Sequence, residues 1–169
     1  MKTIVALVAL GLGMHGIAVA QVVLQDEGEV RVAQGGRVVR LKVDPKSGGA
    51  TQFVVGTELM PPGAVLPTHR HPNQEEVFLI HRGILTVKLG SAAPKEAQAG
   101  AVVFVPKGTC VSLENKGAGD ATVVFIFPQP GMDNFLRRAM PASGEQPRTR
   151  EELAPIWNDH QQNIALGPC

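Results

Sequence analysis

The sequence is poor in aromatic residues and carries almost no net charge. Aromatic residues make up 4% of the 169 positions and tyrosine is absent, which argues against a surface on which nucleic-acid bases stack. Sixteen basic side chains stand against fifteen acidic ones, so nothing electrostatic suggests nucleic acid or an acidic membrane as a partner. The 19 glycines and 13 prolines favour short strands joined by turns over a helical bundle. The length suggests one domain.

A long uninterrupted apolar run occurs at the N-terminus. It covers residues 4–14, and residues 18–20 (Ala-Val-Ala) fit the small-x-small cleavage pattern of a secretory signal peptide. We therefore expect residues 1–20 to be a signal peptide, the mature chain to begin at Gln21, and the protein to be periplasmic or secreted. A membrane anchor is the alternative, but His15 interrupts the run before the roughly 20 residues that a span requires.

Cysteine is scarce as well, with only Cys110 and Cys169 in the chain. Exported proteins meet an oxidising compartment in which such a pair can bond. A disulfide between them would close a loop of roughly 60 residues and contribute about 4 kcal/mol in the chain-entropy view. Two unpaired thiols are the alternative, because a sequence does not show whether two Cα atoms come within bonding range.

Apolar and polar residues alternate with the period of a β-strand over much of the chain. Turn-forming segments such as Pro61-Pro62-Gly63 and Pro106-Lys107-Gly108 separate the strand-like ones. The predicted strands are 37–43, 52–60, 76–81, 84–89, 101–105 and 121–127. Many short strands predict an all-β fold, and we expect a small antiparallel β-barrel over residues 37–128. A strand segment at residues 21–36 precedes it.

The pattern becomes helical near the C-terminus. Residues 132–140 place three apolar side chains on one face and predict a short helix. A capping box at Thr149–Glu152 predicts the start of a second helix, and Pro155 predicts that this helix is kinked or starts later. We expect residues 129–169 to be a helical extension packed on the barrel.

The residues with the clearest chemistry lie close together in the middle of the chain. His69 and His71 are two positions apart, so on a strand both imidazoles project from one face. Glu75 and Glu76 follow the turn-forming Pro72-Asn73, and a hairpin would bring one carboxylate beside the imidazoles. Two imidazole nitrogens and a carboxylate on one side of a cation form a facial triad with open positions. An exposed polar hairpin that binds nothing is the alternative.

These spacings resemble the two conserved motifs of the cupin superfamily. The residues that match the first motif are Gly63, His69, His71, Glu76 and Gly83, and those that match the second are Gly100, Pro106, Gly108 and Asn115. The resemblance covers about residues 37–128 and is closest to single-domain bacterial cupins. It implies a jelly-roll barrel in which His69, His71 and Glu76 bind a divalent metal ion. In the first motif six residues separate the glutamate from the glycine, and this spacing to Gly83 fits Glu76 and not Glu75.

One position departs from the family pattern. Metal-binding cupins place a histidine three residues after the glycine of Pro-x-Gly, and here that position is Val111. Three ligands still match the facial triad of iron oxygenases and the three-ligand rule for catalytic zinc, and they suit iron, manganese, zinc and nickel alike. Water, Cys110, His81 or His160 could take the vacated position. Strand alternation points Cys110 away from the cavity, and we expect His81 and His160 to be exposed.

The resemblance implies two functions of different classes. The first is an exported metal-dependent enzyme, a dioxygenase-type oxidoreductase acting on a small organic molecule, with cupin isomerases and lyases as variants of the same chemistry. The second is a non-catalytic binding protein, which the loss of the histidine at Val111 favours. Phe78 and Ile80 share the parity of Glu76, and we expect them to line the barrel interior together with Val111 and Leu113. These side chains predict a mostly apolar cavity. The family also implies a possible homodimer through edge strands.

Overall fold

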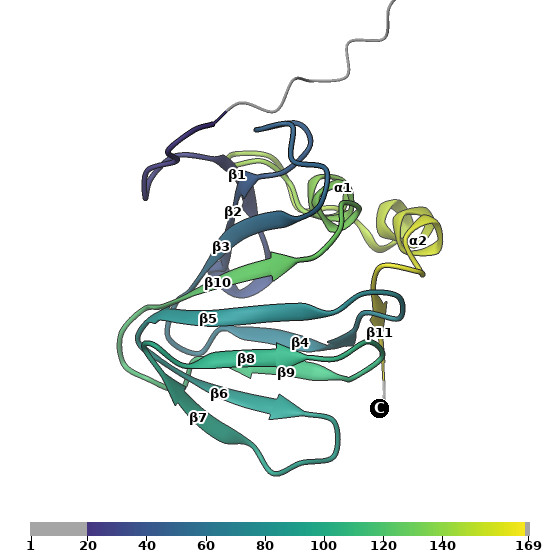
Figure 1. Cartoon of the computed structure of the whole chain (residues 1–169). Coiled ribbons are helices and arrows are strands. Elements are labelled where there is room, and N and C mark those ends of the chain that lie inside the picture. Colours follow the sequence, from purple (N-terminus) through teal and green to yellow (C-terminus); the bar gives the residue numbers. More distant parts are fainter. Residues whose placement is uncertain (1–19, 168–169) are drawn as a thin grey trace, which may run out of the picture.

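The computed structural model describes residues 20–167, in which two antiparallel sheets pack face to face (Figure 1). The six-stranded sheet has the order β1 (Glu29–Val32), β2 (Val38–Val43), β3 (Val54–Met60), β10 (Ala121–Phe127), β5 (Glu76–Arg82) and β8 (Val102–Val105). The five-stranded sheet has the order β11 (Ala165–Leu166), β4 (Val65–Arg70), β9 (Val111–Glu114), β6 (Ile84–Leu89) and β7 (Lys95–Gln98). The predicted all-β architecture is confirmed. The signal-peptide cleavage pattern and Cys169 involve residues outside the described range.

Strand alternation determines which side chains form the core. Every second residue of β3 is buried, and the same holds for the inward positions of β5 and β10. The side chains that these strands bury meet those of β6 and β9 between the sheets, among them Phe78, Ile80, Leu85, Leu113 and Val123. The core is therefore the space between two sheets, as expected for a β-sandwich or a flattened barrel.

Four strands lie outside the list of predicted strands. β7 and β11 are short strands at the edges of their sheet, and β9 has only four residues. β4 contains Pro67 and mostly exposed side chains, so neither composition nor alternation marks it clearly. β4, β9 and β11 form because ladders to distant segments hold them, which a local pattern does not reveal, whereas β7 pairs with the preceding strand, β6.

The predicted hairpin between the histidines and the glutamate is wrong. β4 pairs with β9 and β11, whereas β5 pairs with β10 and β8. The two strands therefore belong to opposite sheets, and within the described residues no ladder joins them. The turn at residues 72–75 leads the chain from one sheet across to the other.

The helices follow β10, as predicted, and lie at one side of the sandwich (Figure 1). α1 (Met132–Ala139) buries Phe135 and Leu136. α2 (Arg150–Asp159) starts at the predicted capping box, because Thr149 Oγ1 accepts from the Glu152 amide at 3.2 Å. Pro155 lies inside α2, so the expected later start is wrong. A short 3₁₀ helix, η1 (Gln34–Gly36), precedes β2.

Two further observations concern Cys110 and the helices. Cys110 is buried and takes part in a disulfide, while Cys169, the partner considered above, lies outside the described residues. Between residues 20 and 167, none of the helices combines the length and the apolar character needed to cross a bilayer.

Candidate metal centre

The three predicted ligands meet between the two sheets. His69 lies near the end of β4, His71 follows that strand directly, and Glu76 is the first residue of β5. One ligand atom from each lies within 4.8 Å of the other two. All three side chains are almost completely buried. Because β4 and β5 face each other across the sandwich, the histidines approach the carboxylate from the opposite sheet.

Backbone carbonyl groups fix the orientation of both imidazoles. His69 Nδ1 lies 2.8 Å from the carbonyl oxygen of Pro67, and His71 Nδ1 lies 2.6 Å from that of Asn163. A carbonyl oxygen only accepts, so each Nδ1 must carry the proton and donate it. In the neutral ring the other nitrogen, Nε2, then presents a lone pair. This is the usual second-shell arrangement of metal-binding histidines.

The lone pairs converge on the carboxylate of Glu76. Its Oε2 lies 3.2 Å from His71 Nε2 and 3.9 Å from His69 Nε2. Among the described residues, neither His71 Nε2 nor Glu76 Oε2 has a hydrogen-bond partner of good geometry. Acceptor atoms this close repel one another unless a cation or a proton lies between them. The donor set therefore fits a divalent metal ion of the kind that binds imidazole and carboxylate.

Burial also shifts the protonation equilibria of these groups. Burial, aided by the neighbouring His71, lowers the pKa of His69 to about 4, so its imidazole is neutral and available as a ligand near pH 7. Burial raises the pKa of Glu76, although His71 opposes the rise. A metal ion would have to displace the proton that a buried carboxyl otherwise tends to hold.

A cavity of about 60 Å³ lies beside the ligands. Its barrel side consists of Val39, Glu58, Leu66, Phe78, Phe125 and Phe127, together with the three ligands. Its opposite side consists of Met132, Phe135, Leu136, Met140 and Ile164 from the C-terminal extension. The wall is thus mostly apolar. Phe78 lines it as predicted, whereas Ile80, Val111 and Leu113 are buried in the core outside the lining.

Glu58 is a polar residue of this cavity that the sequence analysis missed. It lies on β3, is buried, and forms an ion pair with Arg37, which is equally buried. Burial raises the pKa of Glu58, and the charge of Arg37 opposes the rise. A signal was present in the sequence: Glu58 occupies an inward position of a strand whose other inward residues are apolar or glycine.

The remaining candidates lie elsewhere. Glu75 is exposed, which agrees with the choice of Glu76, and His81 is exposed as expected. The expectation that His160 is exposed is wrong, because its ring packs against Phe135 with a centroid distance of 5.6 Å and is buried. The disulfide of Cys110 removes its thiolate as a ligand.

Gly108 of the second motif supports the site from outside. The Gly108 amide donates to the carbonyl oxygen of His71 at 2.8 Å. The backbone of Gly108 has a φ of +71°, a conformation that residues other than glycine rarely adopt. Asn115 Nδ2 donates to the carbonyl oxygen of Met60 at 2.7 Å. Val111 is buried on β9 directly opposite His69 in the ladder. Gly108 therefore holds the backbone at His71, and the second motif adds no fourth ligand.

Comparison with known proteins agrees with this arrangement. Residues 56–127 match the family model of the cupin domain. Over 117 residues the chain is 28% identical to Protein SchB of Streptomyces halstedii, covering 67% of this chain and 83% of SchB.

Solved structures share the fold at lower sequence identity. KdgF from Halomonas sp. superposes with a TM-score of 0.59 at 16% identity, over 68% of this chain and 99% of KdgF. A recombinant oxalate oxidase in complex with glycolate superposes with a TM-score of 0.52 at 22% identity, over 59% of this chain and 55% of that one. The chain thus spans about half of the oxalate oxidase. The motifs, the sheet topology and these comparisons together indicate that residues 56–127 form the centre of a domain of the cupin superfamily.

Proposed function

We propose that this protein is an exported, metal-dependent oxidoreductase of the dioxygenase type that acts on a small organic molecule. One observation carries the proposal: Nε2 of His69, Nε2 of His71 and Oε2 of Glu76 converge in a buried site, and carbonyl partners leave both imidazoles with lone pairs facing the carboxylate. A metal cation would balance the negative charge of this buried donor set when Glu76 is ionised. The ion would be iron, manganese, zinc or nickel.

The chain's own residues would bind the ion and limit access to it. His69 and His71 supply neutral nitrogens, and Glu76 supplies one negative charge. When bound, a divalent ion provides a Lewis acid with open coordination positions for O₂ or an oxygen atom of the substrate. Val111 cannot ligate, so it leaves such a position open. The apolar wall around Phe78 and Phe125 excludes water from the reacting molecule.

The oxidoreductase assignment has support of a second kind. The oxalate oxidase that shares the fold is named for the oxidation of a two-carbon acid, and its structure holds glycolate, another two-carbon acid. A cavity of about 60 Å³ suits molecules of similarly small size. A non-catalytic binding protein is the second candidate, and Val111 in place of a fourth ligand favours it. A cupin isomerase or lyase would use the same triad.

Export is also proposed. The disulfide of Cys110 supports an oxidising compartment, and the N-terminal pattern supports a cleaved signal peptide. N-terminal sequencing of the exported protein should begin at Gln21. Recovery of an intact Met1 from a membrane fraction would refute cleavage.

Elemental analysis of protein purified from its own compartment tests the metal site. We expect close to one transition-metal ion per chain, and we expect its loss in the His69→Ala, His71→Ala and Glu76→Ala variants, because each retains only two protein ligands. Glu75→Ala is the matched control, since that carboxylate is exposed, and it should keep its metal. Metal-free wild-type protein that takes up no iron, manganese, nickel, copper or zinc would exclude the metal site.

The enzyme and the binder differ in turnover. Metal-loaded protein should consume O₂ in the presence of a substrate drawn from small hydroxy, keto and dicarboxylic acids, and Glu76→Ala should abolish this consumption. A small molecule that co-purifies unchanged and is not consumed under air would favour the binding protein instead.

A further inference from the structure

The C-terminal extension, residues 129–167, forms one wall of the metal cavity. Met132, Phe135 and Leu136 of α1 line the cavity, together with Met140 and Ile164. All three α1 residues are buried. The barrel alone would leave the apolar side chains of Phe78 and Phe125 and the ligands uncovered at this point. A molecule that occupies this cavity therefore contacts α1 or displaces it.

The extension is joined directly to the strand that bears the ligands. β11 pairs with β4 in the register Leu166↔His69 and Ala165↔Arg70. Just before β11, the carbonyl oxygen of Asn163 accepts from His71 Nδ1 at 2.6 Å. The same segment therefore orients a ligand and covers the cavity.

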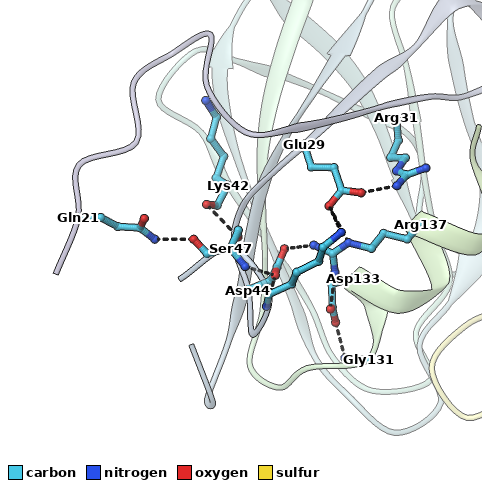
Figure 2. A network of polar contacts seen from close by, with 10 residues as sticks. Gln21, Glu29, Arg31, Lys42, Asp44, Ser47, Gly131, Asp133 and Arg137 are labelled. Carbon is cyan, nitrogen blue, oxygen red and sulfur yellow. Dashed lines mark hydrogen bonds and ion pairs between the residues drawn. The ribbon is translucent and has the colours of Figure 1, made fainter. Parts of the chain in front are cut away.

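An ion-pair network fixes α1 to the six-stranded sheet. Figure 2 shows Arg137 of α1 pointing into a group of three carboxylates. Its guanidinium contacts Asp44 at 2.6 Å, Glu29 at 2.7 Å and Asp133 at 2.8 Å. Asp44 follows β2, and Glu29 is the first residue of β1. This anchor makes α1 a fixed wall, because releasing it would leave buried carboxylates without their cation.

Phe135 of α1 is held between the cavity and aromatic rings of the C-terminal extension. Its ring packs against Trp157 of α2 with a centroid distance of 4.7 Å and against His160 at 5.6 Å. These neighbours leave the ring little room to move away from the cavity. The volume next to the ion is therefore limited by a side chain that a ligand cannot easily push aside.

We propose that α1 is the specificity element of the metal site, with Phe135 setting an upper limit on the size of the group that a ligand can place beside the ion. The proposal rests on the metal site proposed above. The expected substrates are compact molecules whose metal-binding oxygen atom has no ring or long chain beside it. A bulkier molecule would meet the Phe135 ring before it reached the ion.

Exogenous ligands of two sizes test this limit on the full chain loaded with Co²⁺. Azide is the small probe and 4-phenylimidazole the large one, and the visible absorption bands of Co²⁺ report binding of each. We expect wild type to bind azide and to bind 4-phenylimidazole weakly or not at all. In Phe135→Ala the preference should move toward 4-phenylimidazole by about tenfold or more, the effect expected for opening space in a tight pocket.

Two further variants complete the test. Ile156→Ala removes another buried apolar side chain, from α2, that does not line the cavity, so it should keep the wild-type preference. Phe135→Leu removes less volume and should give a smaller change in the same direction if Phe135→Ala does not fold.

The outcomes separate this inference from the proposed function. Wild type that binds both probes equally well, Phe135 variants that keep its preference, or an Ile156→Ala variant that shifts it equally would each overturn the size limit alone. Wild type without Co²⁺ bands, or His71→Ala with unchanged bands, would overturn the metal site and this inference with it.

Discussion

Replacing Arg137 by methionine should destabilise the protein far more than the same change at the next residue. The Arg137 side chain is 12% exposed, and its partners Asp44 and Asp133 are 0% and 3% exposed. Methionine has a similar length but no charge, so the variant would leave these carboxylates buried without their cation (Figure 2). Breaking such a pair from one side costs about 3–5 kcal/mol.

Arg138 provides the matched control. It pairs with Asp159 at 2.8 Å, but the two side chains are 45% and 58% exposed. A solvent-exposed pair contributes about 0–1 kcal/mol. Arg138→Met should therefore leave the free energy of unfolding nearly unchanged, although it lies on the same helix and loses the same charge.

Urea and thermal unfolding of the two variants and wild type give the comparison. For a chain of this length each kcal/mol lowers the Tm by about 2–4 °C, so Arg137→Met should melt roughly 6–20 °C below wild type and Arg138→Met within about 4 °C. Chelators should also strip metal faster from Arg137→Met, because α1 would cover the cavity less firmly. Equal Tm values for the two variants would refute the assignment of Arg137 as the anchor of α1.

Three other expectations can be checked directly. Val111→His would place an imidazole opposite His69 on the same face of the β4–β9 ladder, so Zn²⁺ should bind about tenfold more tightly or better by calorimetry; an unchanged affinity would contradict the register. Burial alone would raise the pKa of Glu29, but hydrogen bonds from two arginines lower it to about 2. The pKa of Glu29 is thus lower in the folded state than in the unfolded state. The stability that Glu29 contributes at neutral pH should therefore be lost as the pH falls from 4.5 to 2. Urea titrations in which the unfolding free energy stays constant over that range would contradict this. Phe104 is 51% exposed on the edge strand β8, so we expect a homodimer by light scattering that Phe104→Lys converts to monomer, and a monomeric wild type would exclude this interface.

The clustering of His69, His71 and Glu76 could be predicted from the sequence because their spacing is local. His69 and His71 share a face by strand parity alone, and Glu76 lies only five residues further along. The pairing of the strands could not be predicted in the same way. A turn at residues 72–75 is equally compatible with a hairpin, and what excludes the hairpin is the pairing of β4 with β9 and of β5 with β10. Those ladders depend on segments far away in the chain.

The environment of the site was harder to predict than its ligands. The carbonyl oxygen of Asn163 carries no side-chain signature, so its contact with His71 has no signal in the sequence. His160 reads as a surface residue of a polar helix, yet Phe135 of the other helix covers it. Glu58 could have been recognised by its inward parity, but its partner Arg37 lies 21 positions away. Tertiary contacts decided all three cases.

The contact between His71 and Asn163 also has a consequence for the order in which the site forms. The two residues are 92 positions apart, so during synthesis the barrel strands are complete well before the carbonyl that orients the imidazole exists. Contacts over such separations form late in folding because a long loop must close first. A nascent chain would hold His69 and Glu76 in place while His71 still rotates, and it would bind metal weakly. High affinity would then arise only once the last strand has joined β4, so the complete chain would bind metal more tightly than any shorter nascent chain.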